Sequence, residues 1–330
     1  MGWLTRAIDA GGDRRATMDE IEDGLFITSG ERRAKISQFW VLLVLASVIA
    51  AGGVVGDSTP AVIGAMIVAP LATPIYGVAL ATVTGSRRDL LASLKLLVVG
   101  VAVNVLIGVL LGAITVERLP VDANPQILGR TAPALLDLTV AVAVGIAGSF
   151  ALVRRDVSNI LAGVAIAISL VPVLAVVGIT LGSGRLDLAW GAFLLFLTNA
   201  AAIIIAGVLV FTAAGYARVA AARGRHPRRR AKVVITVFVL LLLIPLTGAS
   251  FRTLEYELWM RTTDEAAHRW VEGTDWDVSG VTQAGNDIVI TALGQGDPPS
   301  IKALREDVRQ DVPSSVDVLV IEESGKTTAL

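Results

Sequence analysis

Long apolar runs separated by short charged segments occupy most of the first 250 residues. Seven of these runs approach the roughly 20 residues that a helix needs to cross the hydrocarbon core of a bilayer. We therefore predict seven transmembrane helices, at about residues 36–55, 60–83, 90–116, 133–153, 157–181, 188–214 and 233–250. The pattern predicts an all-α polytopic membrane bundle, preceded by a polar segment at residues 1–35.

The last 80 residues, 251–330, have a different pattern, in which apolar and polar positions alternate over short stretches. We predict in turn a helix, two strands, a helix and a strand, at residues 252–271, 275–281, 287–292, 300–310 and 315–321. A turn at residues 284–286 would join the first two strands into a hairpin. The segment carries 15 Asp and Glu against 7 Lys and Arg. It is predicted to be a small acidic α+β domain of the order αββαβ.

The polar N-terminal segment contains one helix signal. Thr17 followed by Glu20 three residues later is typical of a capping box, and Met18, Ile21 and Leu25 would share one face of the helix. This short amphipathic helix would lie either on the membrane surface or against the bundle. The charged start of the chain does not resemble a cleavable signal peptide.

Composition agrees with a membrane protein and excludes several kinds of chemistry. The chain is 54% hydrophobic and 17% charged, with a mean hydropathy of +0.70, whereas soluble domains carry about 25% charged residues. With no cysteine and two histidines, the sequence offers neither a thiolate nor a zinc site. No nucleophile lies beside a base, so we expect no enzyme, cofactor, metal or nucleic-acid partner.

Lys and Arg residues are distributed unequally between the loops on the two sides. The predicted topology places 14 near the membrane on one side and 4 on the other. By the positive-inside rule the richer side is cytoplasmic. The N-terminus is then cytoplasmic and the domain at 251–330 extracytoplasmic. The basic loop at 215–232 would bind anionic lipid headgroups or act only as an orientation anchor, through the residues Arg225, Arg228, Arg229 and Arg230.

The spans resemble one another at an offset of 99 residues. Gly64 corresponds to Gly163, Gly85 to Gly184, and the Gly-Val-Leu at 108–110 to that at 207–209. Residues 36–116 and 133–214 would therefore be two three-span repeats, joined by an outer loop at 117–132. Because three is an odd number, the second repeat must be inverted in the membrane. Inverted 3+3 repeats with interrupted helices are a recurrent plan of secondary transporters.

Prolines interrupt two corresponding spans. Pro70 cannot donate an N–H to the carbonyl of Met66, and Pro74 cannot donate one to the carbonyl of Pro70. These two carbonyls, with the Thr73 hydroxyl, would form an oxygen-rich surface that must be buried or face water. Pro172 similarly frees the carbonyl of Ile168, beside Ser169. The alternative is that all three prolines only kink their helices for packing.

Three other polar residues lie within predicted spans. Asn104 and Asn199, in the third and sixth spans, would line a solute pathway or bond to a neighbouring helix. Asp137 lies about one turn inside the fourth span, where a carboxylate is costly and often functional. It would pair with an ion or proton, or reach the membrane interface.

Four stretches strongly resemble the DUF389 family of bacterial hydrophobic membrane proteins. They begin STPAVIGAMIVAPLATPIYG, RTAPALLDLTVAV, LAGVAIAISLVPVLAV and LLFLTNAAAIIIAG, and the resemblance covers about residues 36–216. It implies an integral protein of the bacterial cytoplasmic membrane and no established activity. The positions that carry the motifs are Gly64, Pro70, Pro74, Pro133, Asp137, Gly163, Pro172 and Asn199. The family pattern has a double proline where this chain has Pro172-Val173.

Two functions from different classes fit these patterns. The first is a transporter or channel that moves an ion or small polar solute past the proline-broken helices, with the solute unidentified. The second is a non-transporting scaffold or sensor whose outer domain binds a partner or signal. In both cases the lipid bilayer is a partner, and a homo-oligomer is compatible with either.

Overall fold

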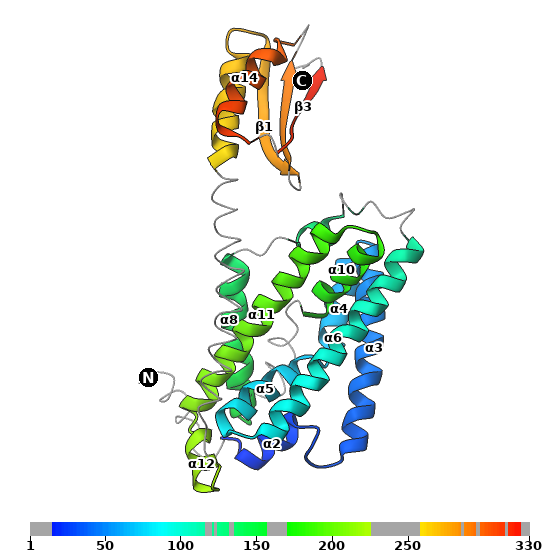
Figure 1. Cartoon of the computed structure of the whole chain (residues 1–330), viewed down its shortest axis with the longest axis vertical. Coiled ribbons are helices and arrows are strands. Elements are labelled where there is room, and N and C mark those ends of the chain that lie inside the picture. The colour runs from blue at the N-terminus through cyan, green and yellow to red at the C-terminus, as the bar shows by residue number, and fades with distance from the viewer. Residues whose placement is uncertain are drawn as a thin grey trace. The chain divides into compact units, whose positions relative to one another are not determined.

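The chain folds into two compact units, residues Met1–Thr247 and Gly248–Leu330. The computed structural model describes residues 15–115, 121, 124–131, 135–156, 170–225, 258–284, 287–294, 298–313 and 316–324. Predictions for the seventh span, at 233–250, and for the first part of the fifth span lie outside the described residues. The two units are drawn in Figure 1 and are taken separately below.

The first unit is a bundle of apolar helices. Within the described residues, three of them are long and apolar enough to cross a membrane by themselves: α3 (Arg32–Val55), α6 (Arg87–Thr115) and α11 (Leu186–Ala213). Large apolar side chains on these helices stay exposed, as on the lipid-facing surface of a membrane protein: Val41, Leu45, Val98, Leu106, Ile114 and Trp190. The chain is therefore a membrane protein.

A fourth candidate span is broken in its middle. It consists of α4 (Thr59–Val68) and α5 (Ala72–Thr84), which are bent by 44° relative to each other. The last regular bond of the first half joins the N–H of Ala69 to the carbonyl of Ala65, at 3.1 Å. The next residue is Pro70, which has no N–H and cannot continue the helix. The predicted interruption of residues 60–83 is present.

Two shorter apolar helices, α8 (Leu135–Val153) and α10 (Leu170–Gly182), lie in the fourth and fifth predicted spans. α10 packs against α6 and α11, and α5 packs against the same two long helices. Every residue of α5 except Thr73 is buried, and so is α10 from Leu170 to Thr180. The two short helices α5 and α10 are thus buried inside the bundle, each packed against the long helices α6 and α11, and Figure 1 shows α5 toward the end that carries α2 and α10 toward the other end.

Three short helices complete the described part of this unit. They are α2 (Met18–Leu25), α7 (Pro125–Leu128) and α12 (Tyr216–Ala222). α2 has the predicted capping box, because Glu20 N–H donates to Thr17 Oγ1 and Thr17 N–H donates to the Glu20 carboxylate. Its apolar face is buried against the bundle, which decides between the two predicted locations.

The second unit is an α+β domain with the predicted order αββαβ. Residues 258–271 are helical, and β1 (Trp276–Ala284), β2 (Asp287–Gly294), α14 (Ile301–Asp311) and β3 (Val318–Ser324) follow. The sheet order is β1-β2-β3, with β1 and β2 antiparallel and β2 and β3 parallel. Helix 258–271 and α14 cover one face of the sheet, over Ile288, Ile290 and Ala292. β3 ends three residues later than predicted.

Candidate functional site

The proline break is a junction between two helices and has fewer free backbone carbonyl groups than predicted. Thr73 N–H donates to the carbonyl of Pro70, at 3.2 Å, so that carbonyl is not free. Pro74 is the third residue of α5 and lies in its first turn, where an N–H has no intrahelical acceptor. The prediction that Pro74 frees a carbonyl is therefore wrong, because a new helix begins just before it. Pro70 and Thr73 are half-buried and Pro74 is buried, while Met66 is half-buried on α4.

The most unusual polar group in the membrane unit is the side chain of Asn104, near the middle of α6. It is 0% exposed, and neither its Oδ1 nor its Nδ2 has a hydrogen-bond partner among the described residues. A buried amide without a partner costs about 1–3 kcal/mol in proteins. In the middle of a membrane helix, such a group is expected to meet a polar partner.

The neighbours of Asn104 on α6 locate this amide within the bundle. Gly100 and Gly108 lie one turn to either side, on the same face of the helix. A Cβ on Gly100 would lie 3.1 Å from Leu71 Cδ2, at the break, and one on Gly108 would lie 2.8 Å from the carbonyl oxygen of Ala175, on α10. Asn104 therefore lies between the break and α10.

Asn199 repeats part of this arrangement near the middle of α11. Its side chain is buried, with 5% exposed, and its Oδ1 has no partner among the described residues. By contrast, the buried hydroxyls of Ser149 and Thr180 bond to carbonyls of their own helices, at 2.6 and 2.7 Å. The two predicted asparagines thus differ from the buried hydroxyl groups, which are satisfied locally.

Two of the remaining predicted site residues, Asp137 and Pro172, lie on α8 and α10. Asp137 is half-buried in the first turn of α8 and takes part in an interaction with another group. Pro172 is buried on α10. The predictions for Ile168, Ser169, Gly163, Pro133, Arg228, Arg229 and Arg230 fall outside the described residues.

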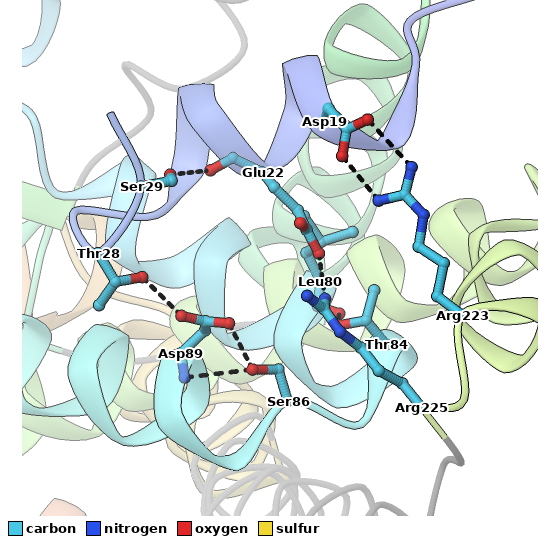
Figure 2. Close-up of polar contacts among 10 residues, drawn as sticks. All are labelled: Asp19, Glu22, Thr28, Ser29, Leu80, Thr84, Ser86, Asp89, Arg223 and Arg225. Carbon is cyan, nitrogen blue, oxygen red and sulfur yellow. Dashed lines mark hydrogen bonds and ion pairs between the residues drawn. The ribbon is translucent and has the colours of Figure 1, made fainter. Parts of the chain in front are cut away.

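A second polar region lies at the end of the bundle that carries α2, and we call it the α2 end. Four carboxylates of this helix each pair with a basic residue from another segment. Figure 2 shows Asp19 with both terminal nitrogens of Arg223, at 2.6 and 3.0 Å, and Glu22 with Arg225, at 2.6 Å. The other pairs are Glu20 with Arg155, at 2.6 Å, and Asp23 with Lys35, at 2.7 Å. Arg225, a predicted lipid ligand, is thus paired within the chain.

Hydrogen bonds to the backbone and α6 also hold this segment. Ala16 N–H donates to the carbonyl of Val153, at 2.8 Å, and Tyr216 Oη donates to the carbonyl of Ala16, at 2.7 Å. On the other side of α2, Thr28 Oγ1 donates to Asp89 on α6, at 2.6 Å (Figure 2). The segment from residue 15 to residue 30 therefore connects α8 and α12 to α3 and α6.

The ion pairs of α2 lower the pKa of two carboxyl groups. A hydrogen bond from Arg223 lowers the pKa of Asp19 below its usual value. The pKa of Glu20 is lowered first by the Thr17 backbone N–H and then by Arg155. Both side chains lie at the surface, so their charges are screened by water and salt.

Sequence reasoning missed the contact that Tyr76 makes with α8. The hydroxyl of Tyr76, in the buried α5, lies 3.4 Å from the carbonyls of Val144 and Gly145. The sequence feature that could have indicated Tyr76 is the presence of a polar aromatic residue inside an apolar run. Asn104, by contrast, was predicted, and the spacing Gly100, Asn104, Gly108 marks its helix face as one in close contact with its neighbours.

No cluster of His, Asp and Glu in the described part of the chain has the arrangement of a metal site. Among the described residues of the membrane unit, the buried polar side chains are uncharged amides and hydroxyls: Ser47, Thr82, Thr84, Ser93, Asn104, Asn124, Gln126, Ser149, Thr180, Thr198 and Asn199. These buried side chains can therefore donate and accept hydrogen bonds.

The central part of the membrane unit is similar in sequence to known proteins. Residues 66–205 match the family model described as Domain of unknown function (DUF389). An uncharacterized protein of Methanocaldococcus jannaschii, MJ0678, is 32% identical over 176 residues, covering 53% of this chain and 53% of that protein. The chain therefore spans about half the length of the relative that it matches. The resemblance to DUF389 seen in the sequence is confirmed.

Proposed function

We propose that this chain, a membrane protein with a DUF389 match at residues 66–205, moves a small polar solute or ion across the cytoplasmic membrane. In this proposal the chain crosses the membrane seven times, and the positive-inside rule sets its orientation. The observation that carries the proposal is the buried amide of Asn104, whose polar atoms lack partners within the described residues. Asn104 lies between a broken span and α10, which is the place where transporters with interrupted helices bind their solutes.

Matching helix ends favour the inverted repeat that such a transporter would contain. At the offset of 99 residues, the start of α6 coincides with that of α11, and the C-terminal ends of α5 and α10 agree within one residue. The turns between these helices also correspond. Gly85 and Gly184 both have a left-handed backbone, with φ of 72° and 78°. Across them, Ser86 N–H donates to the carbonyl of Ala81 and Arg185 N–H to that of Thr180.

Helix contacts between the halves follow the same offset. Gly108 of α6 packs against Ala175 and Gly178 of α10, where a Cβ would lie 2.8 and 2.9 Å from the nearest atoms. The corresponding Gly207 of α11 packs against Tyr76 and Ala79 of α5. Each long helix thus packs against the short central helix of the other half. Such an exchange of partners is what a two-fold relation between the repeats predicts.

In the proposed mechanism the two asparagines exchange hydrogen bonds with the solute as it passes the break. Their amides can donate and accept, so a polar solute would replace the water that it loses on entering the bundle. The α2 end would be closed in this state, because α2 and its ion pairs connect helices of both repeats. Movement of one repeat against the other would open each side in turn.

A flux assay on the protein reconstituted into liposomes tests this proposal. The panel would contain Na⁺, K⁺, chloride, phosphate, urea and glycerol. Asn104→Leu, which keeps the side-chain size and removes the amide, is expected to lower flux at least about tenfold. Thr82→Val is the matched control, because the Thr82 hydroxyl bonds to the carbonyl of Val78 in its own helix. Wild-type flux in Asn104→Leu would exclude the amide from the pathway.

The scaffold or sensor remains a second candidate function, favoured by one observation. The acidic C-terminal unit has its own core and a groove of about 380 Å³ between α14 and β3. A wild-type protein that transports none of the solutes, but still binds a partner through this unit, would favour the scaffold over the transporter.

A further inference from the structure

The end of the bundle opposite α2 carries the short helix α7. α2 is attached at the start of α3, whereas Asn124, just before α7, donates to a backbone carbonyl near the end of α3, at 2.9 Å. Gln126 Nε2 donates to Thr59 Oγ1, at 3.0 Å, where α4 begins. The carbonyl oxygen of Thr131, after α7, lies so close to Gly191 of α11 that a Cβ there would meet it at 1.9 Å. This segment therefore contacts helices of both proposed repeats.

Arg130 follows α7 and has one edge of its guanidinium without a partner. Its Nη1 donates to the carbonyl oxygen and to Oε1 of Gln126, at 2.8 and 3.0 Å. Its Nε is enclosed and has no hydrogen-bond partner within the described residues. No carboxylate in the described part of the chain pairs with Arg130, and Asp187, at the same end of the bundle, is paired with Arg185 at 2.8 Å. An enclosed N–H donor and a positive charge are thus left for another group.

Partial burial without a counter-ion distinguishes Arg130 from Arg185. Burial lowers the pKa of Arg130 from its usual value. The pKa of Arg185 is instead raised, first by its hydrogen bond to Asp187. Arginine nevertheless keeps its proton in proteins at neutral pH. The charge of Arg130 is therefore present, half-buried and available to an anion.

From this unpartnered edge, we propose that Arg130 binds a small oxyanion at the end of the bundle opposite α2. The Nε and Nη2 of a guanidinium present two parallel N–H groups, which match two oxygens of a carboxylate, phosphate or sulfate. Gln126 holds the plane of the guanidinium through Nη1, so the free edge is already oriented. A bound oxyanion satisfies Nε and offsets the charge in one step.

The position of Arg130 also names a class of solute. It lies beside contacts to both proposed repeats, where a solute would enter or leave, and its charge raises the local concentration of anions. The transported solute is then a small anion that meets Arg130 on its way to Asn104, an assignment that rests on the proposed function. A lipid phosphate has the same chemistry, but the enclosed Nε favours a free ion over a headgroup held at the membrane surface.

Isothermal titration of the detergent-solubilised full chain with sodium phosphate, sulfate and acetate, at constant ionic strength, tests the binding site. Arg130→Gln is expected to weaken binding at least about tenfold, because it removes both the charge and the free edge. Arg185→Gln is the matched control, with the same change of charge at the same end of the bundle, and is expected to bind like the wild type. A wild type that binds none of the three anions, or equal weakening in both variants, would overturn the proposal.

A second variant separates binding from a purely structural role of the contact with Gln126. Arg130→Lys keeps the charge but loses the planar edge, so its affinity for phosphate should lie between those of the wild type and Arg130→Gln. Thermal unfolding without anion would show that both variants are folded. If folded Arg130→Gln binds phosphate like the wild type, Arg130 is not the ligand.

Two further measurements distinguish a free anion from a lipid and this inference from the proposed function. In phosphatidylglycerol nanodiscs the affinity for phosphate should match that in a phosphate-free detergent; loss of binding there would assign Arg130 to a headgroup and overturn the proposal. In the liposome flux assay, anions should be the solutes that move. Flux of only cations or neutral solutes would reject the anionic solute and leave the transporter standing. Anion binding without any flux would leave the site standing and reject the transporter.

Discussion

The two polar regions of the membrane unit differ in whether their polar side chains have hydrogen-bond or ion-pair partners. At the α2 end, Asp19, Glu20, Glu22 and Asp23 are each paired with an arginine or lysine from another segment. In the middle of the bundle, Asn104 is fully buried and neither of its amide atoms has a partner within the described residues. The carboxylates are therefore paired, and all of them except the half-buried Glu22 are exposed, whereas the Asn104 amide is buried and has no partner among those residues.

This difference separates structural polar groups from candidate functional ones. A pair at the surface stabilises by about 0–1 kcal/mol because water already solvates both charges. An unpaired buried amide lowers stability by more than that, so its presence needs another explanation. In the proposed function, the α2 end connects helices and the middle of the bundle contacts a solute. Three measurements test this comparison between the two polar regions.

The largest effect is expected for Asn104→Leu on the stability of the protein. Replacing an unpartnered amide by an apolar side chain of similar size should raise the free energy of unfolding by about 1–3 kcal/mol. Thermal unfolding in detergent micelles would measure this gain, with Thr82→Val as the control that should change stability less. If Asn104→Leu instead destabilises the protein, the amide has a structural partner and the comparison fails.

A smaller effect is expected from reversing one ion pair of α2. Glu20→Arg puts a like charge beside Arg155 and should lower the protection of backbone amides 18–25 against hydrogen exchange by up to about fivefold. Adding Arg155→Glu restores opposite charges and should recover most of the protection. Glu31→Arg is a control, at an exposed carboxylate for which no ion pair is found within the described residues. Equal loss in the single and double variants would mean that the pair contributes nothing.

The smallest effect is expected from acidification. Because the folded chain lowers the pKa of Asp19 and Glu20, their contribution to stability is present above the ordinary carboxyl pKa. It should be lost as the pH falls through the lowered values, below about pH 4. Hydrogen exchange of amides 18–25, corrected for the intrinsic rate, would show this loss. Protection that is unchanged down to pH 2 would assign the attachment of α2 to its apolar face alone.

Local signals in the sequence predicted much of the fold. The missing N–H of Pro70 predicts an interrupted span, and the pair Thr17 and Glu20 predicts where α2 begins, because both act on neighbouring backbone groups. Alternation along the C-terminal segment predicts the order of its elements for the same reason. The prediction that the Pro70 carbonyl is free was wrong, because a new helix begins two residues later and the Thr73 N–H donates to this carbonyl.

Long-range contacts could not be predicted in this way. Glu20 and Arg155 are 135 residues apart, and Asp19 and Arg223 are 204 apart, so nothing near either residue indicates the pairing. Asn104 was recognised as a polar residue in a span, but whether its amide has a partner depends on which helices surround it. Residue type thus predicts a candidate functional residue, and the packing of the helices decides whether its polar atoms have hydrogen-bond partners.

The helices α6 and α5 differ in length, and this difference determines how each responds to the thickness of the bilayer. With 29 residues, α6 is about 43 Å long, and α5, with 13, is about 20 Å long. α6 exposes Val98, Leu106 and Ile114 and is longer than the roughly 30 Å hydrocarbon core, so a thinner membrane should tilt it. α5 is almost entirely enclosed by protein and has little surface on which lipid can act. Since Asn104 is carried by α6, the lipid environment can shift this amide relative to the break.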